Sequence, residues 1–145
     1  MRALRPALDR SRERTGHAAA ILNVSSIASI TGRGSSIAYS ASKAALNGLT
    51  VSLACALAPR IRVNAVCPGF VDSGWWETHA DADRRAAIRE GVAAMVPLRA
   101  ASTPADVADA ALPFCLPATR HVTGETLLID AGMRMMMGPE DWGAR

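Results

Sequence analysis

Three short apolar runs alternate with longer amphipathic stretches along this chain. The first run, residues 19–24, reads AAILNV and lies between Gly16 and two serines. The second run, residues 61–67, alternates and then becomes continuously apolar, and the third covers residues 126–130. Short apolar runs with such boundaries predict buried strands of a parallel sheet.

The stretches between these runs predict four helices. Their expected ranges are residues 1–14, 37–58, 82–94 and 105–116. We expect Gly16 to end the first helix and Pro59 the second, and Pro104 occupies a first-turn position of the last. Residues 27–36 contain two glycines and several small polar residues, which predicts a loop. The alternation of strands and helices therefore predicts an α/β fold.

The composition excludes several kinds of function. A chain of 145 residues is expected to form at most one domain, with a core built mainly from Ala, Val, Leu and Ile. The net charge of +3 comes from scattered arginines without a basic stripe interleaved with aromatic residues, so nucleic acid binding is not expected. No apolar run reaches 18 residues, so no membrane span is expected.

The acidic residues, cysteines and histidines give expectations about targeting, redox state and metal binding. Asp9 and Glu13 argue against an import signal in the Arg-rich residues 1–14, so we expect a helix there. The cysteines lie in apolar runs without metal-type spacing and are expected to be reduced core residues of a cytoplasmic protein; they are Cys55, Cys67 and Cys115. The histidines are scattered, are expected to be exposed and predict no metal site; they are His17, His79 and His121.

The chain contains one tyrosine and one lysine, and all the remaining members of its Lys and Arg set are arginines. They are Tyr39 and Lys43, four residues apart within the predicted helix 37–58. Residues at this spacing share one helix face, so the phenol and the ammonium can point into one site. A nearby cation favours the phenolate, and such a phenol can exchange protons in general acid–base catalysis. A chance pair on a solvated helix face is the alternative.

Three motifs around this pair resemble the landmarks of a known family. They are NVSS at residues 23–26 followed by YSASK at 39–43, RVNAVCPG at 62–69, and TGETLLIDAG at 123–132. Their order, and the thirteen positions that lead from Ser26 to Tyr39, resemble the short-chain dehydrogenase/reductase family. The resemblance implies the C-terminal part of a Rossmann-like, doubly wound parallel sheet, about three strands with flanking helices, as a single partial domain over residues 1–145.

The resemblance also implies an NAD(P)-dependent oxidoreductase that transfers hydride between NAD or NADP and an alcohol or ketone. By resemblance, Tyr39 is the catalytic acid/base, Lys43 favours ionisation of that phenol and holds the nicotinamide ribose, and Ser26 hydrogen-bonds the substrate oxygen. In the turn after the second strand, the Val71 backbone would meet the carboxamide and the Ser73 hydroxyl would lie near the pyrophosphate. The cofactor-binding residues implied in this turn are Pro68, Gly69, Val71 and Ser73.

Substrate and partner features are expected outside these motifs. In the family, the helix matching residues 37–58 often lies at a subunit interface, and its small residues would allow close packing, so a homo-oligomer is expected. Trp75 and Trp76 fall where the family has a mobile substrate flap; one could line the pocket while the other packs, or both could pack in a core or interface. The tail methionines are expected to pack at a subunit interface or pocket lid.

One family feature has no counterpart in this sequence. The Gly-rich turn that brings a pyrophosphate to a helix N-terminus is absent, and Gly32-Arg33-Gly34 does not replace it. By the family pattern the chain begins roughly a hundred residues late, which would leave the strand 19–24 with an unpaired edge. Two alternatives stay open: a truncated, inactive relative or gene fragment that needs a partner chain to fold, and an Arg-rich module that binds a polyanion.

Overall fold

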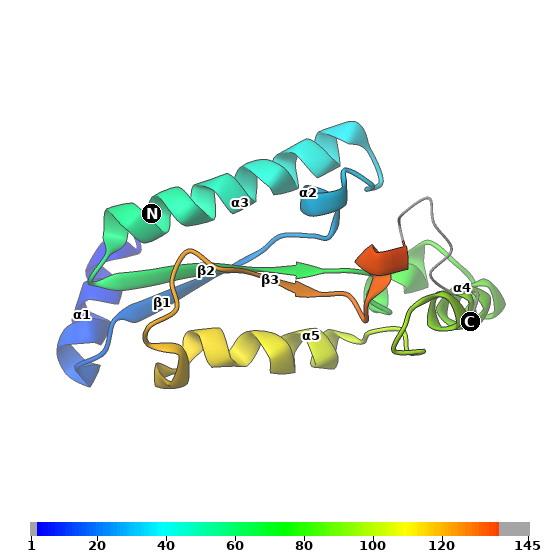
Figure 1. The fold of residues 1–145 in the computed structure, drawn as a ribbon. Coiled ribbons are helices and arrows are strands. Elements are labelled where there is room, and N and C mark those ends of the chain that lie inside the picture. The colour runs from blue at the N-terminus through cyan, green and yellow to red at the C-terminus, as the bar shows by residue number, and fades with distance from the viewer. Residues whose placement is uncertain (1–2, 137–145) are drawn as a thin grey trace.

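The computed structural model describes residues 3–136, which form a three-stranded parallel sheet with helices on both faces (Figure 1). The helices are α1 (Arg5–Thr15), α2 (Ala28–Thr31), α3 (Ile37–Leu57), α4 (Ala82–Met95) and α5 (Pro104–Ala111). The strands are β1 (Ala19–Val24), β2 (Ile61–Pro68) and β3 (Thr126–Ile129). Short 3₁₀ segments are η1 (Gly74–Thr78), η2 (Leu112–Cys115), η3 (Pro117–Thr119) and η4 (Met133–Met136).

The sheet has the order β1-β2-β3, and both pairings are parallel. β1 pairs with β2 from Ala19 opposite Ile61 to Val24 opposite Val66. The predicted α/β fold with parallel strands is confirmed. Within the described residues β1 has a neighbour on one side only, so its outer N–H and C=O groups form an open sheet edge, as expected from the sequence.

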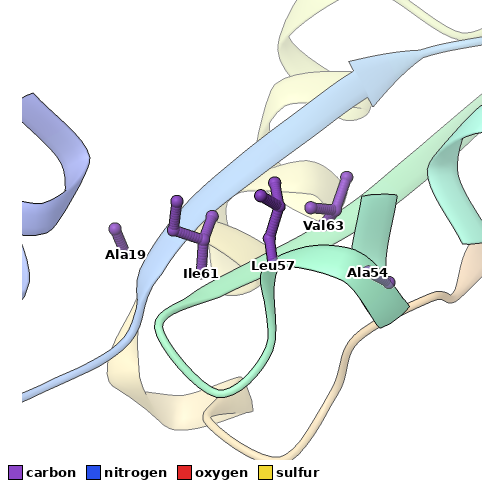
Figure 2. Packing of buried hydrophobic residues seen from close by; sticks show 5 residues of the cluster. All are labelled: Ala19, Ala54, Leu57, Ile61 and Val63. Carbon is purple, nitrogen blue, oxygen red and sulfur yellow. The ribbon is translucent and has the colours of Figure 1, made fainter. Parts of the chain in front are cut away.

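α3 covers one face of the sheet, and α5 lies on the other (Figure 1). A buried apolar cluster joins α3 to the strands; its members are Ala19, Ala54, Leu57, Ile61 and Val63 (Figure 2). Ile61 and Val63 are two residues apart in β2, so their side chains share the face that α3 covers. The cluster contains only small and branched aliphatic residues, which agrees with the predicted composition of the core.

The opposite face of β2 carries polar side chains that hold the segment before β3. Asn64 donates to the Val122 carbonyl at 3.1 Å and accepts the Glu125 N–H at 3.0 Å. The Arg62 guanidinium donates to the carbonyls of Leu116 and Val122, each at 3.2 Å. Arg62 and Asn64 are both buried, so these bonds satisfy backbone groups that would otherwise lie unpaired inside the fold.

The predicted loop at residues 27–36 contains one unpredicted helical segment, α2. The Ser26 hydroxyl accepts the Ala28 N–H at 3.1 Å at the start of α2. Gly32, with φ 70°, ends it in the left-handed conformation that glycine adopts without a steric penalty. Serine before the segment and glycine after it are local signals for such a turn, but four residues are too few to show a helical period.

The helix predicted over residues 105–116 ends early, at Ala111. Pro113 has no N–H to continue the helical bonding, so the chain tightens into η2 instead. The predicted start is correct: Thr103 accepts the Asp106 N–H, and the Asp106 carboxylate accepts the Thr103 N–H at 2.7 Å. The helices predicted at 37–58 and 82–94 and the three strands are confirmed within one or two residues, and the first helix begins later, at Arg5.

The prediction of three core cysteines is wrong at two positions. Cys67 in β2 is fully buried, whereas Cys55 and Cys115 are exposed, because both lie on outward faces of otherwise apolar segments. The three histidines are exposed, as predicted. No helix in the described part of the chain has the length and apolar character needed to cross a bilayer.

The methionine tail is only partly within the described residues. Met133 is buried in a second apolar cluster with Ile27 and Val96, close to the carboxyl end of the sheet. Met135 is 59% exposed. Met137 and Trp142 lie outside the described residues, so the prediction for the end of the tail is not tested.

Candidate active site

The candidate catalytic residues gather at the carboxyl ends of β1 and β2. Ser25 donates its N–H to the Val66 carbonyl at 2.7 Å, which extends the pairing of the two strands to the residue before Ser26. The Ser26 hydroxyl accepts the Ala28 N–H, and none of the residues 3–136 accepts the hydroxyl hydrogen. Ser26 can therefore still donate a hydrogen bond to a ligand oxygen.

A polar network next to Ser26 joins α2, α3 and β2. Ser29 Oγ donates to the Ser26 carbonyl at 2.5 Å and accepts Asn47 Nδ2 at 2.8 Å. Cys67 Sγ lies 3.4 Å from Ser29 Oγ and 3.8 Å from Asn47 Oδ1. These bonds position the backbone of Ser26 through three separate elements.

Sequence reasoning missed the roles of Ser29 and Asn47. Asn47 lies four residues after Lys43, so helical spacing already placed it on the face of the candidate pair. No comparable local signal marked Ser29, because its partners come from other elements of the fold.

Tyr39 stands in the first turn of α3, where two neighbours hold it. The Ser36 hydroxyl accepts the Tyr39 N–H at 3.0 Å and caps the helix. Gly34 lies so close that an added Cβ would be 2.9 Å from Tyr39 Cδ1 and 2.7 Å from Ser40 Oγ. Gly34 therefore permits the approach of the loop to the ring, a role that the sequence analysis did not assign. Tyr39 is 37% exposed, and its hydroxyl bonds to no residue of the described part.

Lys43 lies one helical turn further along the same face and is held by β1. Its Nζ donates to the Val24 carbonyl at 2.9 Å and lies 5.7 Å from the centroid of the Tyr39 ring. Ser25 Oγ donates to the Lys43 carbonyl at 3.1 Å, so backbone and side chain of Lys43 are both tied to the end of β1. An ammonium has three N–H donors, and two of them stay available to a ligand.

The turn after β2 lies beside the start of α2. Ile27 donates its N–H to the Pro68 carbonyl, and Gly69 donates to the Ile129 carbonyl, each at 2.8 Å. A Cβ at Gly69 would lie 2.9 Å from Asp130 Cβ, so the close packing of β3 requires glycine here. Packing against Asp130 thus explains the glycine at position 69 without a ligand.

Two of the expected cofactor-binding groups in this turn have unused donors. The Val71 carbonyl accepts Trp76 Nε1 at 3.0 Å, and the next residue, Asp72, donates its N–H to the Ser102 carbonyl at 2.8 Å. The Val71 N–H and the Ser73 hydroxyl bond to no residue between 3 and 136. Both groups are therefore available to a bound molecule.

An ion-pair network anchors the end of the turn to α4. Arg85 contacts the Asp72 carboxylate at 2.7 Å and the Glu77 carboxylate at 3.1 Å. The hydrogen bond to Asp72, with a smaller contribution from Glu77, raises the pKa of the Arg85 guanidinium above its ordinary value. The two ion pairs thus hold the guanidinium next to the segment that carries Val71 and Ser73.

The adjacent tryptophans have different environments. Trp76 packs 5.4 Å from the Phe70 ring, centroid to centroid, and its indole N–H bonds to the Val71 carbonyl. Trp75 is 56% exposed and stacks on His79 at 3.8 Å. Trp76 therefore packs, while Trp75 offers an aromatic surface to solvent near the turn.

The structure thus brings most of the predicted site residues to one end of the sheet. Lys43 approaches Tyr39 and is bonded two residues before Ser26, and the turn with Pro68 contacts the residue after Ser26. Residues 3–136 contain no group of three or more His, Cys, Asp or Glu side chains placed to hold a metal ion.

The sequence and the parallel α/β arrangement of this chain match known proteins. A family model described as enoyl-(acyl carrier protein) reductase matches residues 1–134. The short-chain dehydrogenase/reductase homolog YusR of Bacillus subtilis is 40% identical over 134 residues, which cover 92% of this chain and 94% of that protein. The chain belongs to the short-chain dehydrogenase/reductase family.

Other relatives are about twice as long as the matched region. The 3-oxoacyl-(acyl-carrier-protein) reductase FabG of Aquifex aeolicus is 38% identical over 78% of this chain but only 44% of its own length. The chain likewise spans 49% of a solved short-chain dehydrogenase/reductase from Burkholderia xenovorans, with 39% identity and a TM-score of 0.78. It spans 52% of a structure described as ElxO with NADP bound, with 28% identity and a TM-score of 0.74.

Proposed function

We propose that this protein is an NAD(P)-dependent oxidoreductase that transfers hydride between a nicotinamide cofactor and an alcohol or ketone. The observation that carries the proposal is the pairing of Lys43, whose Nζ is held by the Val24 carbonyl at 2.9 Å, with the exposed Tyr39 ring 5.7 Å away. A fixed ammonium beside an accessible phenol, at the strand end that carries Ser26, fits proton transfer to and from a substrate oxygen.

In the reductive direction, Tyr39 donates its hydroxyl proton to the carbonyl oxygen as the carbonyl carbon receives hydride. The product is an alcohol, and Tyr39 is left as a phenolate that the Lys43 ammonium stabilises by its charge. Ser26 donates a hydrogen bond to the oxygen on which negative charge develops. Solvent reprotonates Tyr39, whose exposure permits it. In the oxidative direction the phenolate removes the alcohol proton.

The groups left free at the carboxyl end of the sheet fit the nicotinamide half of the cofactor. The bound nicotinamide supplies or accepts the hydride. The Val71 N–H would meet the carboxamide oxygen, the two free donors of Lys43 the ribose hydroxyls, and the Ser73 hydroxyl a phosphate oxygen. Pro68 and Gly69 hold the turn that presents these groups.

The names of the relatives suggest the substrate class to test first. Several are 3-oxoacyl-(acyl-carrier-protein) reductases, and one from Danio rerio is carbonyl reductase family member 4. We therefore propose a ketone, with a 3-oxoacyl thioester as the first candidate. The exposed face of Trp75 would contact the apolar part of such a substrate.

The test is reduction of acetoacetyl-CoA or ethyl acetoacetate by the purified chain with NADH or NADPH, followed by nicotinamide absorbance. We expect Tyr39→Phe to lower kcat by about 10²–10⁴-fold, because it removes the proton donor, while nicotinamide binding measured by fluorescence is retained. Ser52→Ala is the control, since Ser52 is exposed on the same helix. Full activity in Tyr39→Phe would remove Tyr39 from this role. A wild-type chain that neither binds nor oxidises NADH or NADPH would overturn the proposal.

A second candidate is a non-catalytic chain that folds with a partner. The open edge of β1 favours it, as do exposed apolar residues such as Val24, Leu49 and Val51, which are 58%, 50% and 49% exposed. An interface between copies along α3 would cover two of these residues. Analytical ultracentrifugation distinguishes the possibilities: a folded monomer that binds nicotinamide would refute the need for a partner.

The free thiols favour a reducing, cytoplasmic location.

A further inference from the structure

We infer a second binding site, for an oxyanion-bearing small molecule, at the amino ends of β1 and β2. A cavity of about 320 Å³ lies there, at the opposite end of the strands from Ser26 and Lys43. This volume is near the lower limit of small-molecule pockets, roughly 300–1,000 Å³. The polar side chains of its wall are Ser11, Thr15, His17, Arg62 and Arg120. The inference is independent of the oxidoreductase proposal.

The central residue of the proposed site is Arg62, a buried cation that has no carboxylate partner. It is 6% exposed, and no acidic group of the described residues forms an ion pair with it. Three of its five N–H groups donate to neutral oxygens, those of Leu116, Val122 and Thr119. The Nε–H and one Nη2–H have no partner among residues 3–136. A buried charge usually has a counter-charge, and here the chain supplies none.

The unpartnered Nε–H of Arg62 keeps access to solvent. Every fully buried side-chain nitrogen or oxygen among residues 3–136 has a hydrogen-bond partner. The unpartnered Nε of Arg62 must therefore keep contact with solvent, and Arg62 forms part of the cavity wall. An accessible N–H of a guanidinium donates a charge-assisted hydrogen bond to an oxygen of a carboxylate or phosphate.

The charge around the cavity has one sign. None of its wall residues is acidic. The acids of α1 are engaged elsewhere: Asp9 bonds to Arg60 at 2.8 Å and to Arg5 at 3.2 Å, and Glu13 lies 3.9 Å from Arg60. The bond from Arg60 is the main reason that the pKa of Asp9 lies below its usual value, so this carboxylate is committed to that pair.

A smaller neighbouring cavity repeats the pattern. It has a volume of about 240 Å³, and Arg62 and Arg120 line it together with His121, again without an acidic residue. Arg62 and Arg120 thus lie between two hollows, and both hollows are cationic. Leu8 and Leu116 add apolar wall to the larger one, so the ligand that fits is an oxyanion with a short hydrocarbon part.

Thiol protection tests this site on the intact chain. Cys115 lines the larger cavity, whereas the equally free Cys55 lies on α3, away from it, and both are exposed. Labelling by N-ethylmaleimide is followed by mass spectrometry with inorganic phosphate in one arm and succinate in the other, both at constant ionic strength in sodium chloride. We expect several-fold slower labelling of Cys115 in at least one arm, with Cys55 unchanged. The arm that protects identifies a phosphate or a carboxylate ligand.

Matched arginine variants complete the test. Arg120→Gln should raise the half-protecting concentration by roughly tenfold or more, because it removes a charged donor from the wall. Arg84→Gln, an exposed arginine on α4, should leave that concentration unchanged. Equal protection of Cys55 and Cys115, no protection in either arm, or an unchanged response in Arg120→Gln would each overturn the inference.

Discussion

Polar side chains along β2 and at its carboxyl end differ in how many of their hydrogen-bonding groups have partners inside the fold. At the carboxyl end, Lys43 uses one donor on the Val24 carbonyl, and the Tyr39 hydroxyl has no partner in residues 3–136. Further back along β2, Asn64 is fully buried and bonds on both sides of its amide, to Val122 and Glu125. Asn64 thus has partners inside the fold on both sides of its amide, whereas Tyr39 and Lys43 keep free groups, as Arg62 does near the amino end.

This difference separates groups that stabilise the fold from groups that are available for chemistry. A buried amide with all its partners inside the chain contributes to stability, and its loss leaves those partners unpaired. A side chain with spare donors at a strand end contributes little to stability but can bind or exchange protons. Substitutions at the two ends should therefore affect different measurements.

The largest effect is expected for Lys43→Met at the carboxyl end. Turnover should fall by about 10²-fold or more, because the phenolate of Tyr39 loses its counter-charge. The free energy of unfolding, from urea denaturation, should fall by no more than about 2 kcal/mol, the worth of one charged hydrogen bond. Lys43→Arg should rescue turnover poorly, since a planar guanidinium cannot replace a compact ammonium. A large loss of stability in Lys43→Met would break the comparison.

The next effect compares two asparagines. Asn64→Leu should lower the free energy of unfolding by about 2–5 kcal/mol, because the Val122 carbonyl and the Glu125 N–H lose their partners inside the fold. Asn47→Leu removes a bond to Ser29 at the partly buried carboxyl end and should cost only about 1 kcal/mol. Urea denaturation of both variants checks the order. Equal losses would show that the two ends do not differ.

A smaller effect is expected for two glycines near or on α3. Gly34→Ala should lower the free energy of unfolding by about 1–3 kcal/mol, because the new Cβ would overlap Ser40 Oγ and Tyr39 Cδ1. Turnover should fall with it, since the ring must move. Gly48→Ala is the control: its Cβ meets nothing within 4 Å, and alanine should stabilise the helix by about 0.5–1 kcal/mol. Thermal denaturation of the pair gives opposite shifts, and shifts of the same sign would contradict the packing of Gly34.

The smallest effect is expected outside the candidate site, at the start of α5 (Pro104–Ala111). The hydrogen bonds from the Thr103 side chain and backbone hold the pKa of Asp106 below its usual value. Because the folded-state pKa is depressed, the stabilisation is complete above the unfolded-state value of about 3.9 and is lost as pH falls through the folded-state pKa. Thermal denaturation across this acidic range should show a smaller loss in Asp106→Asn than in the wild type. Identical pH profiles would contradict this contribution.

Much of the fold follows from local patterns in the sequence. The apolar runs determine the strands and the amphipathic stretches the helices, because backbone geometry and burial act over a few residues. The candidate pair is local too: Tyr39 and Lys43 are one helical turn apart, so their shared face follows from the helix alone. Alternation along β2 also places Arg62 and Asn64 on the face opposite Val63.

The tertiary structure decided which groups these residues meet. Lys43 is anchored by a carbonyl 19 residues earlier in the chain, and Asn64 holds a turn about 60 residues later. The exposure of Cys55 and Cys115, within apolar segments, depends on which surfaces the other elements cover. Contacts of this kind depend on how the helices pack on the sheet, and no local period encodes them. The sequence therefore determined the elements and the chemistry available, whereas packing determined which polar groups became structural and which stayed free.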